Sequence, residues 1–264
     1  MTGNSKPRIG VYKFASCDGC QLAFLNAGEQ LLQLAELVEI CHFAEAGITD
    51  EQAFVDIAFV EGSIVTASDI ERIQHIRQHS GYLISIGACA TAGGIQALRN
   101  IRDSDSWMSD IYASPEYIDT LGQSTPLASH IDVDLELWGC PVSGQQVMLA
   151  IRSLLFDVLP QQEHDKVCLQ CKRNGSVCVM VSQGVPCMGA VTRSGCGAIC
   201  PSVGRDCYAC FGPAEQTNTD ALSRRFEGLG ILPDAISRRF HFISNDVVPF
   251  RQAGDDYRKD ADDS

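Results

Sequence analysis

The sequence lacks a surplus of basic residues, a transmembrane-length apolar run and an export signal. Its 20 Lys and Arg are outnumbered by 33 Asp and Glu, and the formal net charge is −13 at pH 7. Nucleic-acid-binding proteins present a basic face, so we expect no nucleic-acid partner. The opening residues MTGNSKPR contain no apolar core and no paired arginines, and no stretch of about 18 uncharged apolar residues follows. We therefore expect a cytoplasmic protein with no direct membrane insertion; export as the passenger of a signal-bearing partner is the alternative.

Three further absences limit the cofactors and the folds that the chain can have. No G-x-G-x-x-G follows any strand-like segment, so the sequence does not support a dinucleotide site. The six histidines belong to no ligand motif, and no repeat of the solenoid type is present. Cysteine, in contrast, occurs thirteen times. In a reducing compartment, clustered cysteines more often bind metal or perform redox chemistry than form disulfides.

Residues 1–160 alternate between strand-like and helix-like segments. Short apolar runs at 9–14, 56–60, 82–87 and 133–138 predict buried strands. Apolar residues at helical spacing predict three helices. The first covers 21–40, the second follows a capping box of Ser68 and Glu71, and the third follows a capping box of Ser143 and Gln146. Strands that alternate with helices predict an α/β fold with a flavodoxin-like, doubly wound parallel sheet.

The second region, residues 161–252, has a different composition. Gly, Pro and Cys replace the strand and helix periodicity, and eight of the thirteen cysteines fall between residues 168 and 210. A segment with so little regular structure needs more than a hydrophobic core to hold it together. We predict a loop-rich, cysteine-rich domain here, and an acidic, disordered tail over residues 253–264.

Four cysteines follow three of the predicted strands. Cys17 and Cys20 come after the first strand, Cys89 after the third and Cys140 after the fourth. Ligands of an open parallel sheet collect at the carboxyl ends of its strands, so we expect the four thiols at one edge. Four thiolates suit either a tetrahedral zinc ion or a 4Fe-4S cluster. Cys41 belongs to no such motif, so we expect it to be a buried core residue.

The eight later cysteines do not follow the spacing of a zinc ribbon. They are Cys168, Cys171, Cys178, Cys187, Cys196, Cys200, Cys207 and Cys210. A ribbon would place two C-x2-C pairs about 15–20 residues apart with no cysteine between them. Here 35 residues, four of them cysteines, separate Cys171 from Cys207. Eight thiolates suit two 4Fe-4S clusters, with two zinc sites as the alternative, and the spacing does not assign which four bind which cluster.

Several motifs, taken in order, resemble the small subunit of nickel–iron hydrogenases. They are SCDGCQ, VEGSI at 60–64, GACATAGG, WGCP and the stretch from CMGAVTRSGCGAIC to GRDCYACFGP. The resemblance covers nearly the whole chain except the acidic tail, and it is closest to the cytoplasmic branch of sulfhydrogenase delta and NAD(P)-linked types. Asp18 and Gln21 stand where many periplasmic relatives carry Thr and Glu, which also indicates the cytoplasmic branch.

The resemblance implies that Cys17, Cys20, Cys89 and Cys140 bind the proximal 4Fe-4S cluster, with Glu61 close to it. It implies two further 4Fe-4S clusters on the eight later cysteines. The chain would then relay electrons between the nickel–iron centre of a large partner subunit and an acceptor subunit. That acceptor would bind flavin or NAD(P), or resemble a ferredoxin. This chain would hold no nickel, flavin or NAD(P) and would not be catalytic alone.

Two alternatives stay open. The first is the homologous iron–sulfur subunit of complex I-like oxidoreductases and membrane hydrogenases, which has adjacent cysteines in its first motif and a single cluster. The separation of Cys17 from Cys20 and the eight later cysteines argue against it. The second is a zinc-stabilised interaction protein. Iron content and a visible absorption spectrum would distinguish that class.

Overall fold

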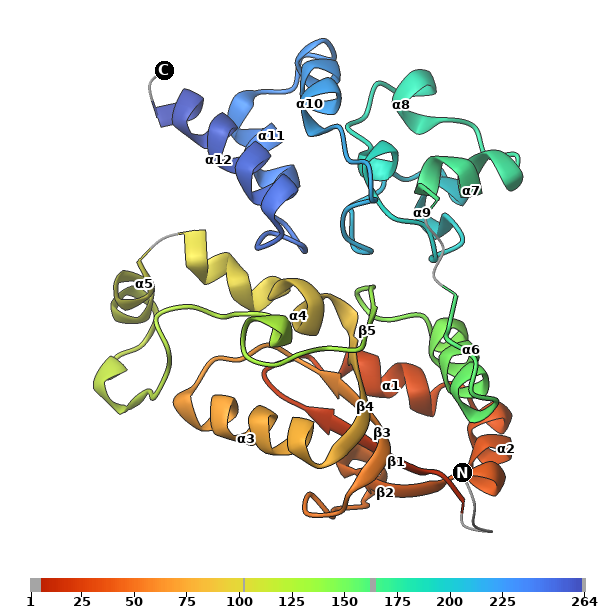
Figure 1. Ribbon diagram of the computed structural model, residues 1–264. Helices are drawn as coiled ribbons and strands as arrows, with labels where there is room; N and C mark the ends of the chain where they lie inside the picture. Colours follow the sequence, from red (N-terminus) through yellow and green to blue (C-terminus); the bar gives the residue numbers. More distant parts are fainter. Residues whose placement is uncertain (1–5, 102, 162–164, 263–264) are drawn as a thin grey trace. The chain divides into compact units, whose positions relative to one another are not determined.

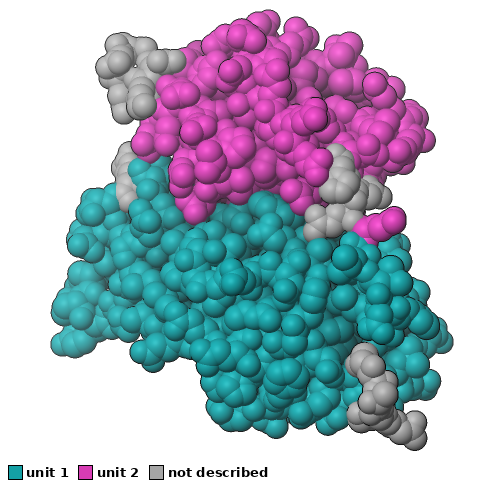
Figure 2. Space-filling model, in the orientation of Figure 1, with its two compact units in different colours: residues 1–160 teal, residues 161–264 magenta. Residues whose placement is uncertain are grey.

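The computed structural model describes residues 6–101, 103–161 and 165–262. The chain divides into two compact units, Met1–Pro160 (unit 1) and Gln161–Ser264 (unit 2), which Figure 2 colours separately. Each unit has a hydrophobic cluster of its own. No helix within the described ranges combines the length and the apolar character that a membrane span requires.

Unit 1 is built around a five-stranded parallel sheet (Figure 1). The strands are β1 (Arg8–Lys13), β2 (Glu39–Phe43), β3 (Val55–Glu61), β4 (Ser80–Ile86) and β5 (Leu135–Leu137). Their order is β2-β1-β3-β4-β5, and every pairing in it is parallel. This is the flavodoxin-like, doubly wound order, so the predicted α/β fold is confirmed.

Alternate residues of the strands pack against opposite helical layers. Ile57 and Phe59 of β3 join the cluster that includes side chains of α1 (Gly19–Leu25), α2 (Glu29–Leu37) and α6 (Gly144–Leu155). Ala58 and Val60 join the cluster that includes side chains of α3 (Ala67–Gln78) and α4 (Gly87–Ala92). This alternation follows from the two-residue period of a strand, and it buries the sheet on both faces.

One predicted helix is two helices and a strand in the structure. The helix expected over 21–40 is interrupted at Gly28, where φ is 56°; α2 follows, and the chain enters β2 at Glu39. The prediction of one long helix was therefore wrong. The strand was missed because β2 lies at an edge of the sheet and carries the polar residues Glu39 and His42, which hide its apolar alternation.

The predicted capping boxes also need correction. α3 begins two residues earlier than expected, because Thr66 and Asp69 form the capping box in place of Ser68 and Glu71. Ser143 does precede α6, but its side chain makes no capping hydrogen bond. Between α4 and β5 the chain forms α5 (Ser104–Ile111). Short 3-10 turns lie at Ala44–Ala46, Ile95–Ile101, Pro115–Tyr117, Leu127–Ser129 and, in unit 2, Met188–Ala190.

Unit 2 begins with short helices and loops and ends with three longer helices. The elements are α7 (Val167–Arg173), α8 (Val179–Ser182), α9 (Ile199–Ser202), α10 (Thr219–Glu227), α11 (Pro233–Phe240) and α12 (Val248–Asp262). Phe226, Phe240 and Phe250 from the last three helices are buried in one cluster with Met188 and Val191. The cysteine-rich segment therefore has a hydrophobic core, much of which comes from a later part of the chain.

Helix α12 covers most of the segment for which the composition predicts a disordered tail. The helix continues to Asp262, and Ala253 is buried in the core of unit 2. The hydroxyl of Ser237 on α11 donates to the carbonyl oxygen of Gly254 at 2.7 Å, and Nε2 of His241, the residue after α11, lies 3.3 Å from an oxygen of Asp255. The prediction of disorder was wrong for residues 253–262, because one face of this acidic helix docks on α11.

Candidate metal centres

The loop between β1 and α1 carries Cys17 and Cys20 in a turn that Asp18 stabilises. Asp18 has φ 62°, in the left-handed region that Asp tolerates better than most residues. Its carboxylate accepts hydrogen bonds from Lys13 Nζ at 2.8 Å and from Ser16 Oγ at 3.1 Å. The bond from Lys13 holds the pKa of Asp18 below its usual value. The turn places both cysteines directly after the carboxyl end of β1.

Cys89 lies in α4, which begins directly after β4. Gly87, the first residue of α4, has φ 81°, and a Cβ there would lie 2.3 Å from Sγ of Cys20. Gly94 has φ 63°, and a Cβ there would lie 2.6 Å from Sγ of Cys89. Any other residue at either glycine would collide with a cysteine sulfur. The Cys89 thiol donates to Oε1 of Gln96 at 3.2 Å.

Backbone contacts join the Cys140 loop to the other two. The carbonyl oxygen of Gly139, two residues after β5, accepts a hydrogen bond from the N–H of Ala88 in α4 at 2.6 Å. The N–H of Val142 donates to the sulfur of Cys20. These two bonds bring the loops after β1, β4 and β5 together at the carboxyl edge of the sheet.

The four thiols of this edge influence one another. Burial is the main cause that raises the pKa of Cys89 to about 12, and the charges of Cys140 and Cys17 raise it further. Burial also raises the pKa of Cys20, reinforced by Glu61, Cys89 and Cys140, and the pKa of Cys140, reinforced by Cys17. Such mutual effects require the sulfurs to lie near one another. The structure therefore brings the four cysteines of the predicted edge site together.

Glu61 lies beside this group at the end of β3 and is almost fully buried. Its carboxylate accepts from the Ser16 hydroxyl at 3.0 Å and from the Gln21 N–H at 3.1 Å. Burial raises the pKa of Glu61, although both hydrogen bonds oppose the shift. The side-chain amide of Gln21 is itself buried, and neither its nitrogen nor its oxygen has a protein partner. An unpaired buried donor beside Cys20 is a group that an inorganic acceptor would satisfy.

The donor set at this edge fits a 4Fe-4S cluster. Four thiols meet there, the two glycines keep side chains away from two of the sulfurs, and Gln21 provides an unused N–H donor. A cluster attaches each thiolate to its own iron, whereas a single zinc ion needs all its ligands around one point. Across the described parts of the chain, no three His, Cys, Asp or Glu side chains are grouped to hold one metal ion.

In unit 2, one group of cysteines gathers around α7 and α8. Burial raises the pKa of Cys168, and the charges of Cys187 and Cys178 raise it further. Burial raises the pKa of Cys171 to about 11, and Cys168, Cys187, Cys178 and Cys196 add to the shift. The sulfurs of Cys168 and Cys187 both lie 3.6 Å from where a Cβ of Gly189 would be.

A second group lies on the loop before α10. The Cys207 N–H donates to Sγ of Cys187 at 3.3 Å, and the Ala209 N–H donates to Sγ of Cys207 at 3.5 Å. Burial is the main cause that raises the pKa of Cys207, and Cys187 and Cys210 contribute. Cys187 thus contacts both groups, and the contacts do not divide the eight cysteines into two sets of four.

Three strained backbone positions mark these cysteine loops. Among the described residues, four non-glycine residues have φ between 50° and 65°: Asp18, Asp157, Ala198 and Ala209. Asp18 lies between Cys17 and Cys20, Ala198 between Cys196 and Cys200, and Ala209 between Cys207 and Cys210. Backbone strain of this kind persists where surrounding structure enforces it, and it concentrates at functional sites.

Some features of the sites were not predicted from the sequence, and one predicted core residue is where we expected it. Cys41 is buried in β2 within the cluster under α3, and Arg8 Nε lies 3.2 Å from its sulfur. Gln96 beside Cys89 and Thr192, whose hydroxyl lies 3.7 Å from Sγ of Cys207, were missed. Gln96 lies two residues after the GACATAGG motif and Thr192 lies four residues before Cys196, so only the folded loops show that they contact the sulfurs.

Comparison with known proteins gives a family and several relatives. Residues 17–154 match the family described as the 20 kDa subunit of NADH ubiquinone oxidoreductase. The chain is 34% identical over 228 residues to the sulfhydrogenase 2 subunit delta of Pyrococcus furiosus, covering 86% of this chain and 94% of that one. It is 29% identical over 240 residues to a subunit of the F420-non-reducing hydrogenase of Methanococcus voltae, covering 80% and 84% of the two chains.

A similar fold occurs in a solved hydrogenase structure. One chain of an NAD+-reducing [NiFe]-hydrogenase in the H2-reduced state superposes with a TM-score of 0.54 and 26% identity. The match covers 59% of this chain and 94% of that chain.

Proposed function

Because the chain belongs to the family of the NADH ubiquinone oxidoreductase 20 kDa subunit, we propose that it is the electron-transfer subunit of a nickel–iron hydrogenase. The observation that carries the proposal is the group of four thiols at the carboxyl edge of the sheet, beside Glu61 and Gln21. The Pyrococcus relative, a sulfhydrogenase subunit, supports it along most of the chain. Hydrogen would be activated on a large partner subunit that holds nickel and iron, so this chain is not catalytic alone.

In this proposal Cys17, Cys20, Cys89 and Cys140 hold the proximal 4Fe-4S cluster. When bound, such a cluster supplies a one-electron redox centre. Three of the four cysteines, Cys20, Cys89 and Cys140, are partly buried, and Gly87 and Gly94 keep side chains away from the sulfurs of Cys20 and Cys89. Glu61 positions the turn through its bonds to Ser16 and to the first turn of α1.

The proposal extends to the eight cysteines of unit 2, which would hold two further 4Fe-4S clusters. Three centres in one chain would relay electrons between the large subunit and an acceptor subunit. That acceptor would bind flavin or NAD(P), or resemble a ferredoxin. A cytoplasmic location is part of the proposal, because thirteen cysteines suit a reducing compartment.

The experiment that tests the relay compares two reactions of one assembled complex. Exchange of deuterium for hydrogen needs no net electron exit from the nickel–iron centre, whereas H2-driven dye reduction does. In a Cys140→Ser complex we expect most of the exchange to remain while dye reduction falls by roughly 100-fold, about the effect of disturbing a metal's surroundings.

The matched control is Cys41→Ser, the same change at a buried cysteine outside both groups. It should leave both reactions near wild type. The Cys140→Ser complex should also contain fewer irons, which shows that the site was disturbed. An assembled Cys140→Ser complex that reduces dye at the wild-type rate would refute the relay assignment.

A further inference from the structure

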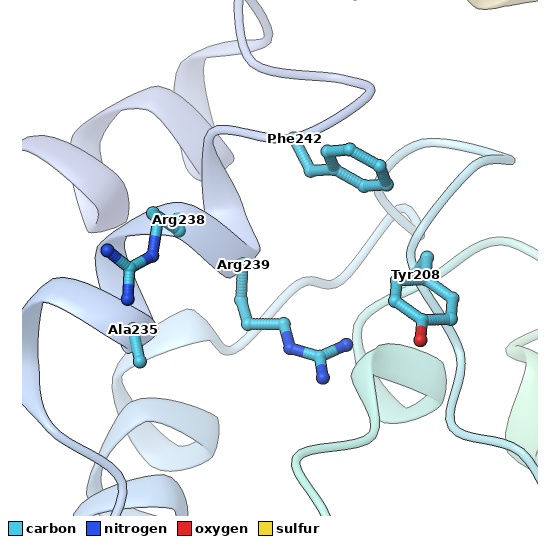
Figure 3. A pocket seen from close by; sticks show the side chains of 5 residues that line it. All are labelled: Tyr208, Ala235, Arg238, Arg239 and Phe242. Atoms are coloured by element: carbon cyan, nitrogen blue, oxygen red, sulfur yellow. The ribbon is translucent and has the colours of Figure 1, made fainter.

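A small pocket in unit 2 lies beside the last cysteine pair and belongs to none of the ligand groups. It is lined by Tyr208, Ala235, Arg238, Arg239 and Phe242, and it has a volume of about 260 Å³ (Figure 3). Tyr208 lies in the chain between Cys207 and Cys210. A group that enters this pocket therefore contacts the loop that carries those two cysteines.

One wall of the pocket is fixed by Arg239. Its guanidinium lies over the ring of Tyr208, 4.9 Å from the centroid, and pairs with the carboxylate of Asp206. Only 23% of the Arg239 side chain is exposed. The ring of Phe242 lies 6.1 Å from that of Tyr208 at 60°. Figure 3 shows Arg239 pointing toward Tyr208, with the Phe242 ring on the same side of the pocket. Arg239 therefore has two partners at this wall, the ring of Tyr208 and the carboxylate of Asp206.

The other arginine, Arg238, is available for a new partner. Its side chain is 73% exposed, and its one described ion pair is with Asp234, four residues earlier on α11, at 2.8 Å. Exposed pairs of this kind contribute little. A guanidinium also has five N–H donors, so Arg238 can bind a second carboxylate while it keeps the first.

The distribution of charge favours the binding of an acidic partner at this pocket. Residues 1–160 carry eight Lys and Arg against twenty Asp and Glu, whereas residues 161–264 carry twelve against thirteen. Within 224–251, five Arg stand against three acidic residues. A third guanidinium, that of Arg205, lies close to Tyr208. The negative charge of residues 1–160 therefore repels an acidic protein, whereas the positive charge of residues 224–251 attracts it.

The size and composition of the pocket point to a protein side chain as the occupant. Small-molecule sites usually begin at about 300 Å³ and extend to about 1,000 Å³. A flavin or a dinucleotide does not fit the space beside Tyr208, whereas one carboxylate side chain does. Tyr and Arg, which line this pocket, are also among the residue types enriched in protein–protein hot spots.

We infer that this pocket docks an acidic side chain of the protein that exchanges electrons with the centre held by Cys207 and Cys210. The inference rests on the proposed function, because it requires a redox centre at those cysteines. The occupant packs against Tyr208 and Phe242, and Arg238, whose side chain is directed away from these two rings in Figure 3, adds positive charge at the rim of the pocket. The docked protein is then held at the loop through which the electron passes.

The test uses the assembled hydrogenase complex and two electron acceptors under H2. The first is a bacterial 4Fe-4S ferredoxin, a small acidic protein, and the second is methyl viologen, a small cationic dye. Arg238→Glu should raise the KM for ferredoxin roughly tenfold, as replacing an interfacial charge does, and rising salt should shrink the difference. The ratio of ferredoxin to viologen turnover falls accordingly.

The matched control is Arg225→Glu. Arg225 is also exposed and lies in the last turn of α10, as Arg238 lies in the last turn of α11. This variant makes the same charge change in the same unit outside the pocket, so the ferredoxin KM should change less than twofold. Ferredoxin whose carboxylates have been converted to amides should no longer distinguish Arg238→Glu from wild type.

Several results would overturn the inference. Equal effects of Arg238→Glu and Arg225→Glu would show a general field effect. Failure of Arg238→Glu alone to assemble would assign the pocket to the permanent contact with the large subunit. A wild-type complex that reduces viologen but no acidic ferredoxin would also overturn the docking inference. A wild-type complex that reduces neither viologen nor ferredoxin under H2 would instead count against the proposed function.

Discussion

The left-handed residues between the cysteines explain how short motifs can aim two thiols at one site. Ala198 has φ 54° and Ala209 has φ 60°, and each lies one or two residues from a cysteine. A left-handed residue reverses the local chain direction at a cost of about 1–2 kcal/mol when it has a Cβ. The Ala209 N–H donates to the sulfur of Cys207, which it could not reach in an extended strand. The strained backbone at Ala209 therefore allows its N–H to bond the sulfur of Cys207.

Cys41 provides the residue-scale prediction, because it is a cysteine with no ligand role in the proposal. Cys41→Ala should leave the iron content and dye reduction of the complex at wild-type levels. The free energy of unfolding should fall by about 1 kcal/mol, since a small buried side chain and its contact with Arg8 are lost. Iron analysis and denaturant unfolding of the same preparations check both parts. A loss of about four irons, a whole cluster, would show that Cys41 is a ligand.

The start of α4 provides the prediction for a whole element. Gly87→Ala would place a methyl group 2.3 Å from the sulfur of Cys20, at a φ of 81° that alanine adopts only with strain. We expect α4 to shift, the four-thiol site to lose about four irons, and stability to fall by about 1–3 kcal/mol.

The control for Gly87→Ala is Gly122→Ala. Gly122 has an ordinary φ, and a Cβ there would meet no atom within 4 Å. This variant should keep its iron and its midpoint of thermal unfolding. If Gly87→Ala binds as much iron as Gly122→Ala, the close approach to Cys20 does not matter for the site.

The elements show how far sequence reasoning reaches in this protein. The four buried strands were predictable because each is a short apolar run, and their parallel order followed from the helices between them. The edge strand β2 was not predictable, because Glu39 and His42 break its pattern and the break at Gly28 depends on backbone geometry. The edge cysteines could be grouped because parallel strands end on one side. The approach of Gly87 to Cys20 could not be predicted, since it depends on the path of two loops.

At the scale of the whole molecule, the two units position their cysteine loops with different scaffolds. In unit 1 the sheet fixes where the cysteine loops begin, so four ligands come from three distant segments. In unit 2 no strand does this in the described residues, and the cysteine loops pack on a core completed by Phe226, Phe240 and Phe250 of the last helices. Separate cores predict that damage to one site stays local.

This separation leads to a prediction about iron. The full chain, assembled anaerobically, should contain about twelve irons and essentially no zinc, because twelve cysteines suit three 4Fe-4S clusters. The double variant Cys17→Ser/Cys20→Ser should lose about four irons, and Cys207→Ser/Cys210→Ser should lose about four others. A protein carrying all four changes should lose the sum, since sites with no shared partners behave additively. Spectroscopic iron counts of the three variants check this. Loss of all iron from either double variant would show that the sites assemble as one, and stoichiometric zinc in the wild-type protein would refute the iron–sulfur assignment itself.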